Sequence, residues 1–252
     1  MTEALASPEE ALVAARAYPG WYHTLDLPGY TTPGYADLRH VPGRALPADL
    51  RGTRALEVAT FDGFWAFELE RRGAEVTCID LPEGTDAQWP PNKRAANEHV
   101  AQAFDLPWGR GFEIASAALG SHVRRVPCDV MDLAPDRVGG TFPLVFCGTL
   151  LQHLRDPVGA LERMHATLDP GGTLLLVETF SVRLTLRHPR TAVGALMTTS
   201  GMSFTWWVPN LRGLEDWART AGFTGPSRRV FASPGQNSGG DLRLACLEFQ
   251  KT

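Results

Sequence analysis

Short runs of apolar residues alternate with amphipathic segments from Arg54 to the end of the chain. Each run is almost continuously apolar, a pattern typical of strands that are buried on both faces. Strands of this kind separated by helices predict an α/β fold, with a mostly parallel sheet covered by helices on both faces. The predicted strands are Ala55–Ala59, Glu75–Ile79, His122–Cys128, Phe142–Phe146 and Thr173–Glu178.

The segments between these strands carry helix signals at both ends. The helix after the first strand has Phe64, Phe67 and Leu69 on its apolar side and ends before Gly73, a typical C′ glycine. Other helices begin with a capping residue or with Asp-Pro, as expected at helix N-termini. They are predicted from Ser7 to about Tyr18, over Asn92–Phe104, Gly111–Gly120 and Asp156–Leu168, and over Leu211–Ala221 after an Asn210 cap.

Two segments do not follow this alternation. Trp21–His40 is rich in aromatic and turn residues, so it is either a packed N-terminal extension or a lid over a small-molecule site. Phe180–Asn210 is long and contains a TTSG turn and the Trp206-Trp207 pair. We therefore expect an extension over residues 1–50 and one domain over residues 51–252, with residues 180–210 as a substrate-side insertion.

The chain ends in a second type of strand pattern. Arg228–Ala232 and Leu242–Phe249 flank the turn-rich sequence SPGQNSGGD. Two strands joined by such a loop predict an antiparallel hairpin at the C-terminal end of the sheet.

Composition narrows the class of protein. The chain has 252 residues and a net charge of −4, a balance that argues against a protein held chiefly on nucleic acid by phosphate contacts. Its four cysteines are scattered and fall in or beside predicted strands, as expected in a reducing compartment. The sequence shows no signal peptide and no apolar run long enough for a membrane span. These observations predict a soluble cytoplasmic protein.

The residues after each strand carry the candidate chemistry, because ligands of open α/β sheets bind at the carboxyl ends of strands. The first strand leads into Glu57-Val58-Ala59-Thr60-Phe61-Asp62-Gly63, a degraded form of a glycine-rich cofactor loop that retains only Gly63. Glu57 lies inside a buried strand, where an unpaired carboxylate is costly, so we expect it to meet a ligand amine or a backbone N–H.

The next strands end in further polar residues. Asp80 follows the second strand and is placed to accept hydrogen bonds from ribose hydroxyls, although an acid at this position is as often a helix cap. Asp129-Val130 follows the third strand, where the carboxylate would accept from an adenine amine. Cys147-Gly148 follows the fourth strand and is expected beneath the same cofactor.

These residues carry a family resemblance. RALEVATFDGFWAFELERRGAEVTCID resembles motif I and the following acid of class I S-adenosylmethionine-dependent methyltransferases. The TFDGF form is most similar to the subgroup of the bacterial tRNA wobble-uridine carboxymethyltransferase and its short relatives. WYHTLDLPGYTTPG, VPCDVMDL, VFCGTLLQHLRDPVGALERM, PGGTLLLVETF and WWVPNLRGLEDWARTAGF resemble further blocks of that subgroup, so the likeness extends over Trp21–Phe223.

The resemblance implies a Rossmann-like, seven-stranded class I methyltransferase fold that binds S-adenosylmethionine without a metal. It places part of the loop along the methionine moiety, Asp80 at the ribose and Asp129 at the adenine. The implied cofactor-binding residues are Glu57, Ala59, Thr60, Phe61, Gly63, Asp80, Leu81, Asp129, Val130, Cys147 and Gly148.

The chain departs from the subgroup in two ways. Ala59 replaces the usual first glycine of the loop, and the long N-terminal extension of the tRNA-modifying enzyme is missing. With the acidic charge, this favours O- or N-methylation of a small-molecule acceptor. The alternatives are a tRNA-modifying methyltransferase and a non-catalytic cofactor-binding protein.

The substrate side offers two candidate bases. His153, just past the fourth strand, is either the base or a structural histidine beside Asp156. His23 is either a lid residue at the reacting groups or an ordinary residue of the extension. Candidate substrate-binding residues are Tyr22, Tyr30, Glu178, Arg183 and Trp206, whose structural alternatives are packing, a salt bridge or a solvated basic face.

The histidines show no metal-ligand spacing, so no metal is expected. The segment from residue 180 to 210 is either a lid or the contact of a homodimer.

Overall fold

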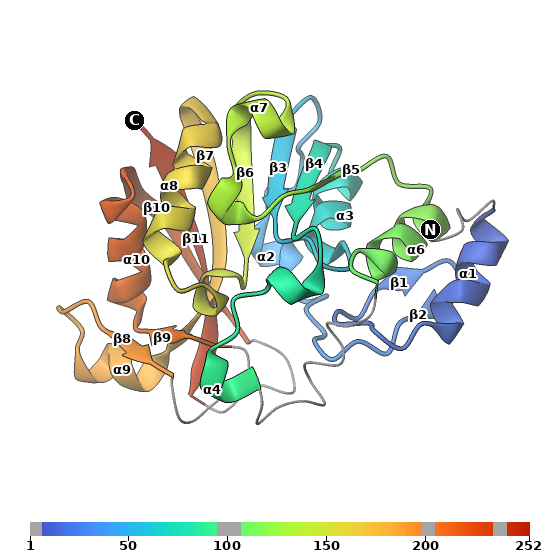
Figure 1. The fold of residues 1–252 in the computed structure, drawn as a ribbon. Coiled ribbons are helices and arrows are strands. Elements are labelled where there is room, and N and C mark those ends of the chain that lie inside the picture. Colours follow the sequence, from blue (N-terminus) through green and yellow to red (C-terminus); the bar gives the residue numbers. More distant parts are fainter. Residues whose placement is uncertain (1–6, 95–106, 198–204, 234–240) are drawn as a thin grey trace.

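The computed structural model describes residues 7–94, 107–197, 205–233 and 241–252 and contains a seven-stranded central sheet (Figure 1). The strand order is β10-β11-β7-β6-β3-β4-β5. The five strands β7, β6, β3, β4 and β5 are parallel to one another. At the β7 edge, β11 pairs antiparallel with β7, and β10 pairs antiparallel with β11. The strands are β3 (Arg54–Val58), β4 (Glu75–Asp80), β5 (Arg124–Pro127), β6 (Phe142–Gly148), β7 (Leu168–Ser181), β10 (Phe223–Ala232) and β11 (Leu242–Lys251). The predicted fold class and its C-terminal hairpin are confirmed.

Alternate residues of the central strands feed two separate cores, because successive side chains of a strand point to opposite faces. Ala55, Phe146 and Val177 belong to one core, and Leu56 and Cys147 to the other. Helices cover both faces (Figure 1). The helices within the described residues are α1 (Pro8–Ala17), α2 (Pro42–Ala45), α3 (Phe64–Arg71), α4 (Pro91–Arg94), α6 (Arg110–Leu119), α7 (Pro135–Val138), α8 (Pro157–Thr167), α9 (Val182–Arg187) and α10 (Leu211–Thr220).

Some predicted boundaries were wrong. The strand expected over Thr173–Glu178 is longer, because β7 already pairs with β6 at Leu168. The Asp-Pro-Gly-Gly sequence just after the predicted helix Asp156–Leu168 is an irregularity within β7, with Gly171 at a φ of 73°. The strand predicted from Arg228 likewise begins earlier, at Phe223.

Three predictions fall wholly or partly outside the described residues. Most of the helix expected over Asn92–Phe104 lies there, and only α4 of that region is described. The TTSG turn and the loop within SPGQNSGGD lie there as well.

The N-terminal segment packs against the sheet core. Trp21, Leu25 and Leu27 are buried in the same core as α3, and the Trp21 indole donates to the Ala15 carbonyl of α1 (2.9 Å). A short hairpin of β1 (Asp26–Leu27) and β2 (Tyr30–Thr31) follows. The division into an extension and a domain stays a prediction.

The insertion after β7 is tied to α10 by one buried side chain. The segment contains α9 and an antiparallel pair of β8 (Gly194–Leu196) and β9 (Trp207–Pro209). The Asn210 amide donates to the carbonyls of His188 and Thr191, both at 2.9 Å. Its oxygen accepts from the N–H groups of Val193 (3.0 Å) and Gly213 (2.8 Å). One fully buried asparagine therefore uses all its hydrogen-bonding capacity to hold this segment.

Candidate functional site

The sheet reverses its strand order beside β3, which lies between β6 and β4. In open α/β sheets, ligands bind at the carboxyl ends of strands next to such a switch point. The predicted site residues that follow β3, β4 and β6 therefore share one end of the sheet.

Left-handed backbone is concentrated at this end. Ala59 (φ 67°), Phe61 (φ 50°) and Gly63 (φ 94°) alternate along the loop after β3, and Thr149 (φ 53°) follows β6. Among the described residues, Ala59, Phe61 and Thr149 are the only residues other than glycine that have a positive φ. Each costs about 1–2 kcal/mol relative to ordinary backbone. Strain of this kind is typical of functional sites, and the loop keeps a glycine-like path with Ala59 and Phe61 in place.

Asp80 joins the loops that follow β3 and β4. Its carboxylate accepts from the N–H groups of Phe61 (2.6 Å) and Leu81 (2.8 Å) and is 6% exposed. Burial raises the pKa of the Asp80 carboxyl, and the Arg125 guanidinium counteracts this. Asp80 therefore bonds to the backbone of the two loops rather than capping a helix, and the predicted ribose contact stays a prediction.

Asp62 ties the N-terminal segment to the same loop. One carboxylate oxygen accepts from the N–H groups of Tyr22 (3.0 Å) and His23 (2.7 Å), and the other lies 2.5 Å from His23 Nδ1. Both side chains are buried, and the His23 ring stacks on Phe64 at 5.2 Å. His23 Nε2 has no hydrogen-bond partner among the described residues. The carboxylate therefore orients an imidazole whose second nitrogen is available.

Aromatic rings surround the loop on the side of the N-terminal segment. Tyr22 stacks with Tyr35 (6.1 Å between centroids) and meets the edge of Phe61 (5.5 Å), which in turn meets Trp108 (5.0 Å). Burial, with the charge of Asp62, raises the pKa of Tyr22 to about 12, so its hydroxyl stays protonated at neutral pH. A small pocket opens beside the loop, lined by Tyr18, Phe61, Asp62, Pro107, Trp108, Gly109 and Gly111.

Glu57 is buried at the end of β3, as predicted, but without the expected partner on one oxygen. It is 1% exposed, and its Oε2 atom meets no donor among the described residues. Burial raises the pKa of the Glu57 carboxyl well above its usual range, and the nearby Asp80 and Asp62 add to this. The indole N–H of Trp65 in α3 is also buried without a described acceptor. The Thr60 hydroxyl opposes the rise in the pKa of Glu57, and the predicted contact of Glu57 with a ligand amine stays a prediction.

Gly148 is required where β6 ends. A Cβ atom at this position would lie 2.7 Å from Trp65 Nε1, which no side chain permits. The neighbouring Cys147 is fully buried, and burial, with the charges of Glu178 and Glu57, raises the pKa of its thiol well above the usual range. A thiol of this kind is a poor nucleophile, and the predicted contact of Cys147 with the cofactor stays a prediction.

Glu178 is the second buried acid with an unsatisfied oxygen. It lies at the end of β7 and is fully buried. Its Oε1 atom accepts from the N–H groups of Leu150 (2.6 Å) and Leu151 (2.7 Å), and Oε2 has no partner among the described residues. Burial raises the pKa of the Glu178 carboxyl to about 8, against the opposing effect of these N–H groups.

The other predicted residues have structural surroundings. Asp129 caps the 3-10 turn Val130–Asp132 by accepting from Met131 N–H (2.9 Å), and Val130 is buried in the core. Thr60 is buried behind the loop, with its N–H bonded to the Ile79 carbonyl (3.1 Å). Their predicted contacts with the cofactor stay predictions.

His153 lies half-buried in the 3-10 turn Leu151–His153 after β6. Its Nε2 atom is 3.2 Å from the Gln152 amide nitrogen, and the Gln152 oxygen accepts from Thr179 Oγ1 (2.6 Å). The Asp156 carboxylate caps α8 through Gly159 N–H. His153 is thus beside the strand ends, and its role as a base stays a prediction.

Three of the predicted substrate-binding residues, Tyr30, Arg183 and Trp206, either contact other parts of the protein or face solvent. Tyr30 lies under the Arg16 guanidinium of α1 (5.5 Å), and Arg183 is exposed on α9. Trp206 donates its indole N–H to the Gln88 carbonyl, and its ring lies under Arg155 at 5.0 Å. These surroundings match the structural alternatives of packing and a solvated basic face.

Sequence reasoning missed Asp62 and Trp65 as site residues. Both were visible inside the quoted TFDGFW stretch, next to Gly63. The available signal was an acid within a cofactor loop, together with a histidine in the upstream aromatic segment.

The structure also limits other classes of site. Within the described ranges, no three histidine, cysteine or acidic side chains come together as a metal site. No helix in the same ranges has the length and apolar character needed to cross a membrane.

Comparisons with known proteins agree with this geometry. Residues 33–226 match the family described as "Methyltransferase domain". Over 183 residues, the chain is 28% identical to the tRNA U34 carboxymethyltransferase of Azotobacter vinelandii, covering 69% of this chain and 46% of that protein. Over 139 residues, it is 30% identical to a ubiquinone biosynthesis O-methyltransferase of Xanthomonas axonopodis pv. citri, covering 55% and 47%. The chain spans about half the length of both relatives.

A solved structure shares the whole fold. The N-terminal domain of EvdMO1 with SAH (S-adenosylhomocysteine) bound gives a TM-score of 0.63 at 15% identity, and the match covers 100% of both chains. The family match spans most of the sequence, so the chain belongs to the methyltransferase-domain family. The predicted family and class I fold are confirmed, and the ligand of that structure, S-adenosylhomocysteine, is the product form of the predicted cofactor.

Proposed function

We propose that this chain binds S-adenosylmethionine at the carboxyl ends of β3, β4 and β6 and transfers its methyl group to a small-molecule acceptor. The observation that carries the proposal is the loop after β3. It holds left-handed backbone at Ala59, Phe61 and Gly63 although only one of them is glycine. Ala59 and Phe61 keep the left-handed conformation although it is strained for residues other than glycine. This indicates that the loop conformation is required, as it is where backbone approaches a ligand closely.

The side chains around the loop fit this cofactor. Its methionine end carries an ammonium and a carboxylate, and the loop is flanked by an unsatisfied acceptor, Glu57 Oε2, and an unsatisfied donor, Trp65 Nε1. Asp80 would hold the ribose, and Asp129-Val130 the adenine. When bound, S-adenosylmethionine supplies an electrophilic methyl group on a positively charged sulfur.

His23 and Asp62 are suited to move the acceptor proton. Asp62 Oδ1 holds His23 Nδ1 at 2.5 Å, which leaves Nε2 free to take a proton from a hydroxyl or a protonated amine. Asp62 is then a positioning residue, and His23 is the base. His153 is the alternative base, because it lies beside the end of β6.

Two observations favour a small acceptor. The relative with 30% identity is a ubiquinone biosynthesis O-methyltransferase. The chain has a net charge of −4, and a negative balance repels a phosphate backbone. The free, buried state of all four cysteines supports the expected cytoplasmic location.

Calorimetry with S-adenosylmethionine and S-adenosylhomocysteine tests the first half of the proposal. We expect both to bind to the wild type and to bind about tenfold to a hundredfold more weakly to Asp80→Asn, which removes a charged acceptor. Asp132→Asn changes an exposed acid and is the matched control. If neither compound gives heat, the proposed function is lost.

Transfer of a labelled methyl group to a panel of phenols, catechols and amines tests the second half. With an acceptor found, we expect His23→Gln to lower kcat at least a hundredfold while the affinity for S-adenosylhomocysteine changes little. The same loss in His153→Gln, with normal turnover in His23→Gln, would transfer the role to His153.

The tRNA relative motivates a second candidate function, because it shares 28% identity over most of this chain. Gel-shift binding to tRNA that weakens steeply with salt, together with methylated tRNA, would favour it. Cofactor binding without turnover of any acceptor would favour the non-catalytic alternative.

A further inference from the structure

Glu178 has an environment that a purely structural acid would not have. Two backbone N–H groups fix Oε1, and Oε2 makes no hydrogen bond of good geometry within the described residues, although the residue is fully buried and the Thr179 N–H also acts on the carboxyl group. A buried carboxylate with an unsatisfied oxygen is costly, so it either holds a proton or receives a charge partner.

No cation of the described chain supplies that partner. The ion pairs between described residues join arginines or His23 to other acids, and none includes Glu178. The elements that pack on β7 carry the following ionisable side chains: Cys147, His153, Glu162, Arg163, His165, Arg183, Arg187, Arg212, Glu215, Asp216, Arg219, Arg243, Cys246, Glu248 and Lys251. Tyr22 of the N-terminal segment and Cys147 are the groups whose pKa values respond to an ionised Glu178.

Other acids make the surroundings more negative. Glu57, Asp62 and Asp80 are all buried at the ends of β3 and β4 or in the loop between them. Glu57 and Glu178 both raise the pKa of Cys147, so the carboxyl groups of β3 and β7 act on one region at the end of β6. A ligand that brings a positive charge to this region would relieve an unfavourable field.

We propose that Glu178 is a proton-exchanging counter-ion: it is a neutral carboxylic acid in the empty protein and ionises when the positively charged sulfur of the cofactor arrives. This inference rests on the proposed function. The proton on Oε2 leaves to solvent on binding, and the carboxylate that remains faces the sulfonium. When the methyl group has been transferred, the sulfur is neutral and Glu178 takes a proton back.

The direction of proton flow follows from the ordinary chemistry of linked equilibria. Burial raises the pKa of the Glu178 carboxyl to about 8, so about 0.9 of the molecules carry the proton at pH 7. A nearby positive charge lowers that pKa, which releases the proton. The preference for S-adenosylmethionine over S-adenosylhomocysteine therefore grows as pH rises, by up to about tenfold per unit below pH 8.

Titration calorimetry at pH 7 in phosphate and in Tris measures the protons exchanged by each ligand, because the two buffers differ in ionisation heat. S-adenosylmethionine and S-adenosylhomocysteine differ in the sulfonium charge, which does not titrate. We expect the first to release at least about half a proton more than the second from the wild type. This difference should fall to about 0.1 in Glu178→Gln.

Glu215→Gln is the matched control, since Glu215 is equally buried but ion-paired. It should keep the wild-type difference. If Glu178→Gln does not fold, the wild type at pH 9 decides, because the carboxyl is then already ionised and the difference should fall to about 0.1 proton.

The outcomes separate two failures. If neither ligand binds, the proposed function is wrong and the inference falls with it. If both bind and release the same number of protons from the wild type, only the inference is overturned. A difference that survives in Glu178→Gln also overturns it and points to another acid such as Glu57.

Discussion

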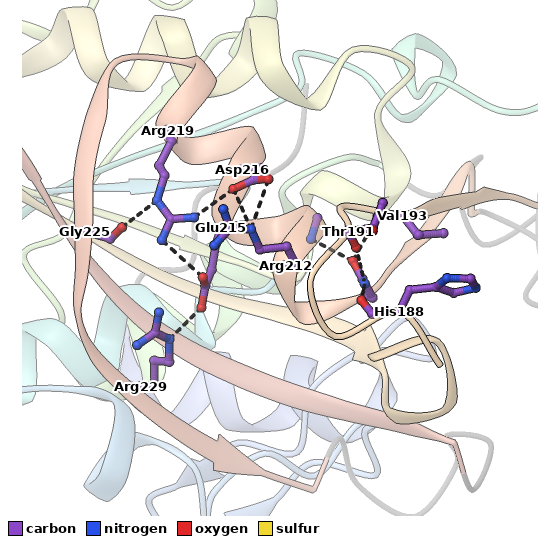
Figure 2. Close-up of polar contacts among 11 residues, drawn as sticks. His188, Thr191, Val193, Arg212, Glu215, Asp216, Arg219, Gly225 and Arg229 are labelled. Carbon is purple, nitrogen blue, oxygen red and sulfur yellow. Dashed lines mark hydrogen bonds and ion pairs between the residues drawn. The ribbon is translucent and has the colours of Figure 1, made fainter. Parts of the chain in front are cut away.

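Glu178 and Glu215 are both buried glutamates, and they differ in what faces their carboxyl groups. Glu215 of α10 is 4% exposed, and both oxygens meet arginines: Arg229 at 2.5 Å and Arg219 at 3.2 Å. Figure 2 shows these contacts together with the bond from Arg219 to the Gly225 carbonyl. Glu178 has two backbone N–H groups on one oxygen and no described partner on the other.

The contrast separates a structural acid from a functional one. Glu215 joins α10 to β10 through Arg229, so its charge is neutralised by the fold itself. Burying Glu178 without a cation costs free energy that the fold does not recover. A cost of this kind is retained where a ligand supplies the missing partner.

The largest effect on stability is expected at Asn210, a buried residue whose hydrogen-bonding groups all have partners. In the wild type, the Asn210 amide donates to the carbonyls of His188 and Thr191. Asn210→Asp replaces this donor with an oxygen that faces both carbonyls. We expect a loss of about 3 kcal/mol in the free energy of unfolding, measured by urea titration. Asn92→Asp, on the exposed surface of α4, is the control and should change little. A loss below about 1 kcal/mol would mean that the hydrogen bonds of Asn210 do not stabilise the fold.

The pH dependence of stability should differ between wild type and Glu178→Gln. Burial raises the pKa of Glu178 to about 8, above its unfolded value, so the native state holds the proton more tightly. The associated stability is present at low pH and is lost as pH rises through 8. Between pH 5 and pH 8 we expect the wild type to lose on the order of 3 kcal/mol more than the variant. Equal slopes in urea titrations at several pH values would show that Glu178 is already ionised.

Glu215→Gln should cost more than Glu178→Gln at pH 7. The glutamine removes the negative charge from both arginines and turns an N–H group toward one of them, but Arg219 and Arg229 are partly exposed and water compensates. We therefore expect a loss of about 1–2 kcal/mol, reduced by salt, against almost none for Glu178→Gln. Thermal unfolding of the two variants side by side measures this. Equal losses would remove the distinction between the two acids.

The smallest effect is expected in the strained loop. Ala59→Gly relieves the left-handed conformation at φ 67°, offset by greater freedom in the unfolded chain. We expect a gain of about 0.5–1 kcal/mol, with unchanged affinity for S-adenosylhomocysteine. Ala66→Gly within α3 is the opposite control and should destabilise. If Ala59→Gly weakened binding, the loop path would depend on the alanine side chain.

The sheet could be predicted from the sequence because its signals are local. Continuous apolar runs identified β3, β4 and β6, and glycines and capping residues located the helices between them. The seven-stranded class I fold came from the family resemblance, since apolar runs do not specify how many strands join one sheet or which neighbours pair. The start of β7 was missed because Asp-Pro-Gly-Gly is typical of a turn, and here pairing with β6 continues on both sides of it.

The site was only partly predictable because its contacts are not local. Glu57, Asp80 and Gly63 could be placed by their spacing from strand ends. The bond between His23 and Asp62 spans 39 residues and depends on how the N-terminal segment packs. The unsatisfied oxygen of Glu178 depends on where the N–H groups of Leu150 and Leu151 point. No sequence pattern contains that information.

Infrared difference spectroscopy of the empty protein and its complex with S-adenosylmethionine tests the central claim most directly, because protonated and ionised carboxyl groups absorb differently. The functional assignment of Glu178 predicts that binding removes a carboxylic-acid band and adds a carboxylate band, and that this change is absent in Glu178→Gln. A band that persists in the complex, in protein shown by calorimetry to bind the ligand, would contradict the assignment.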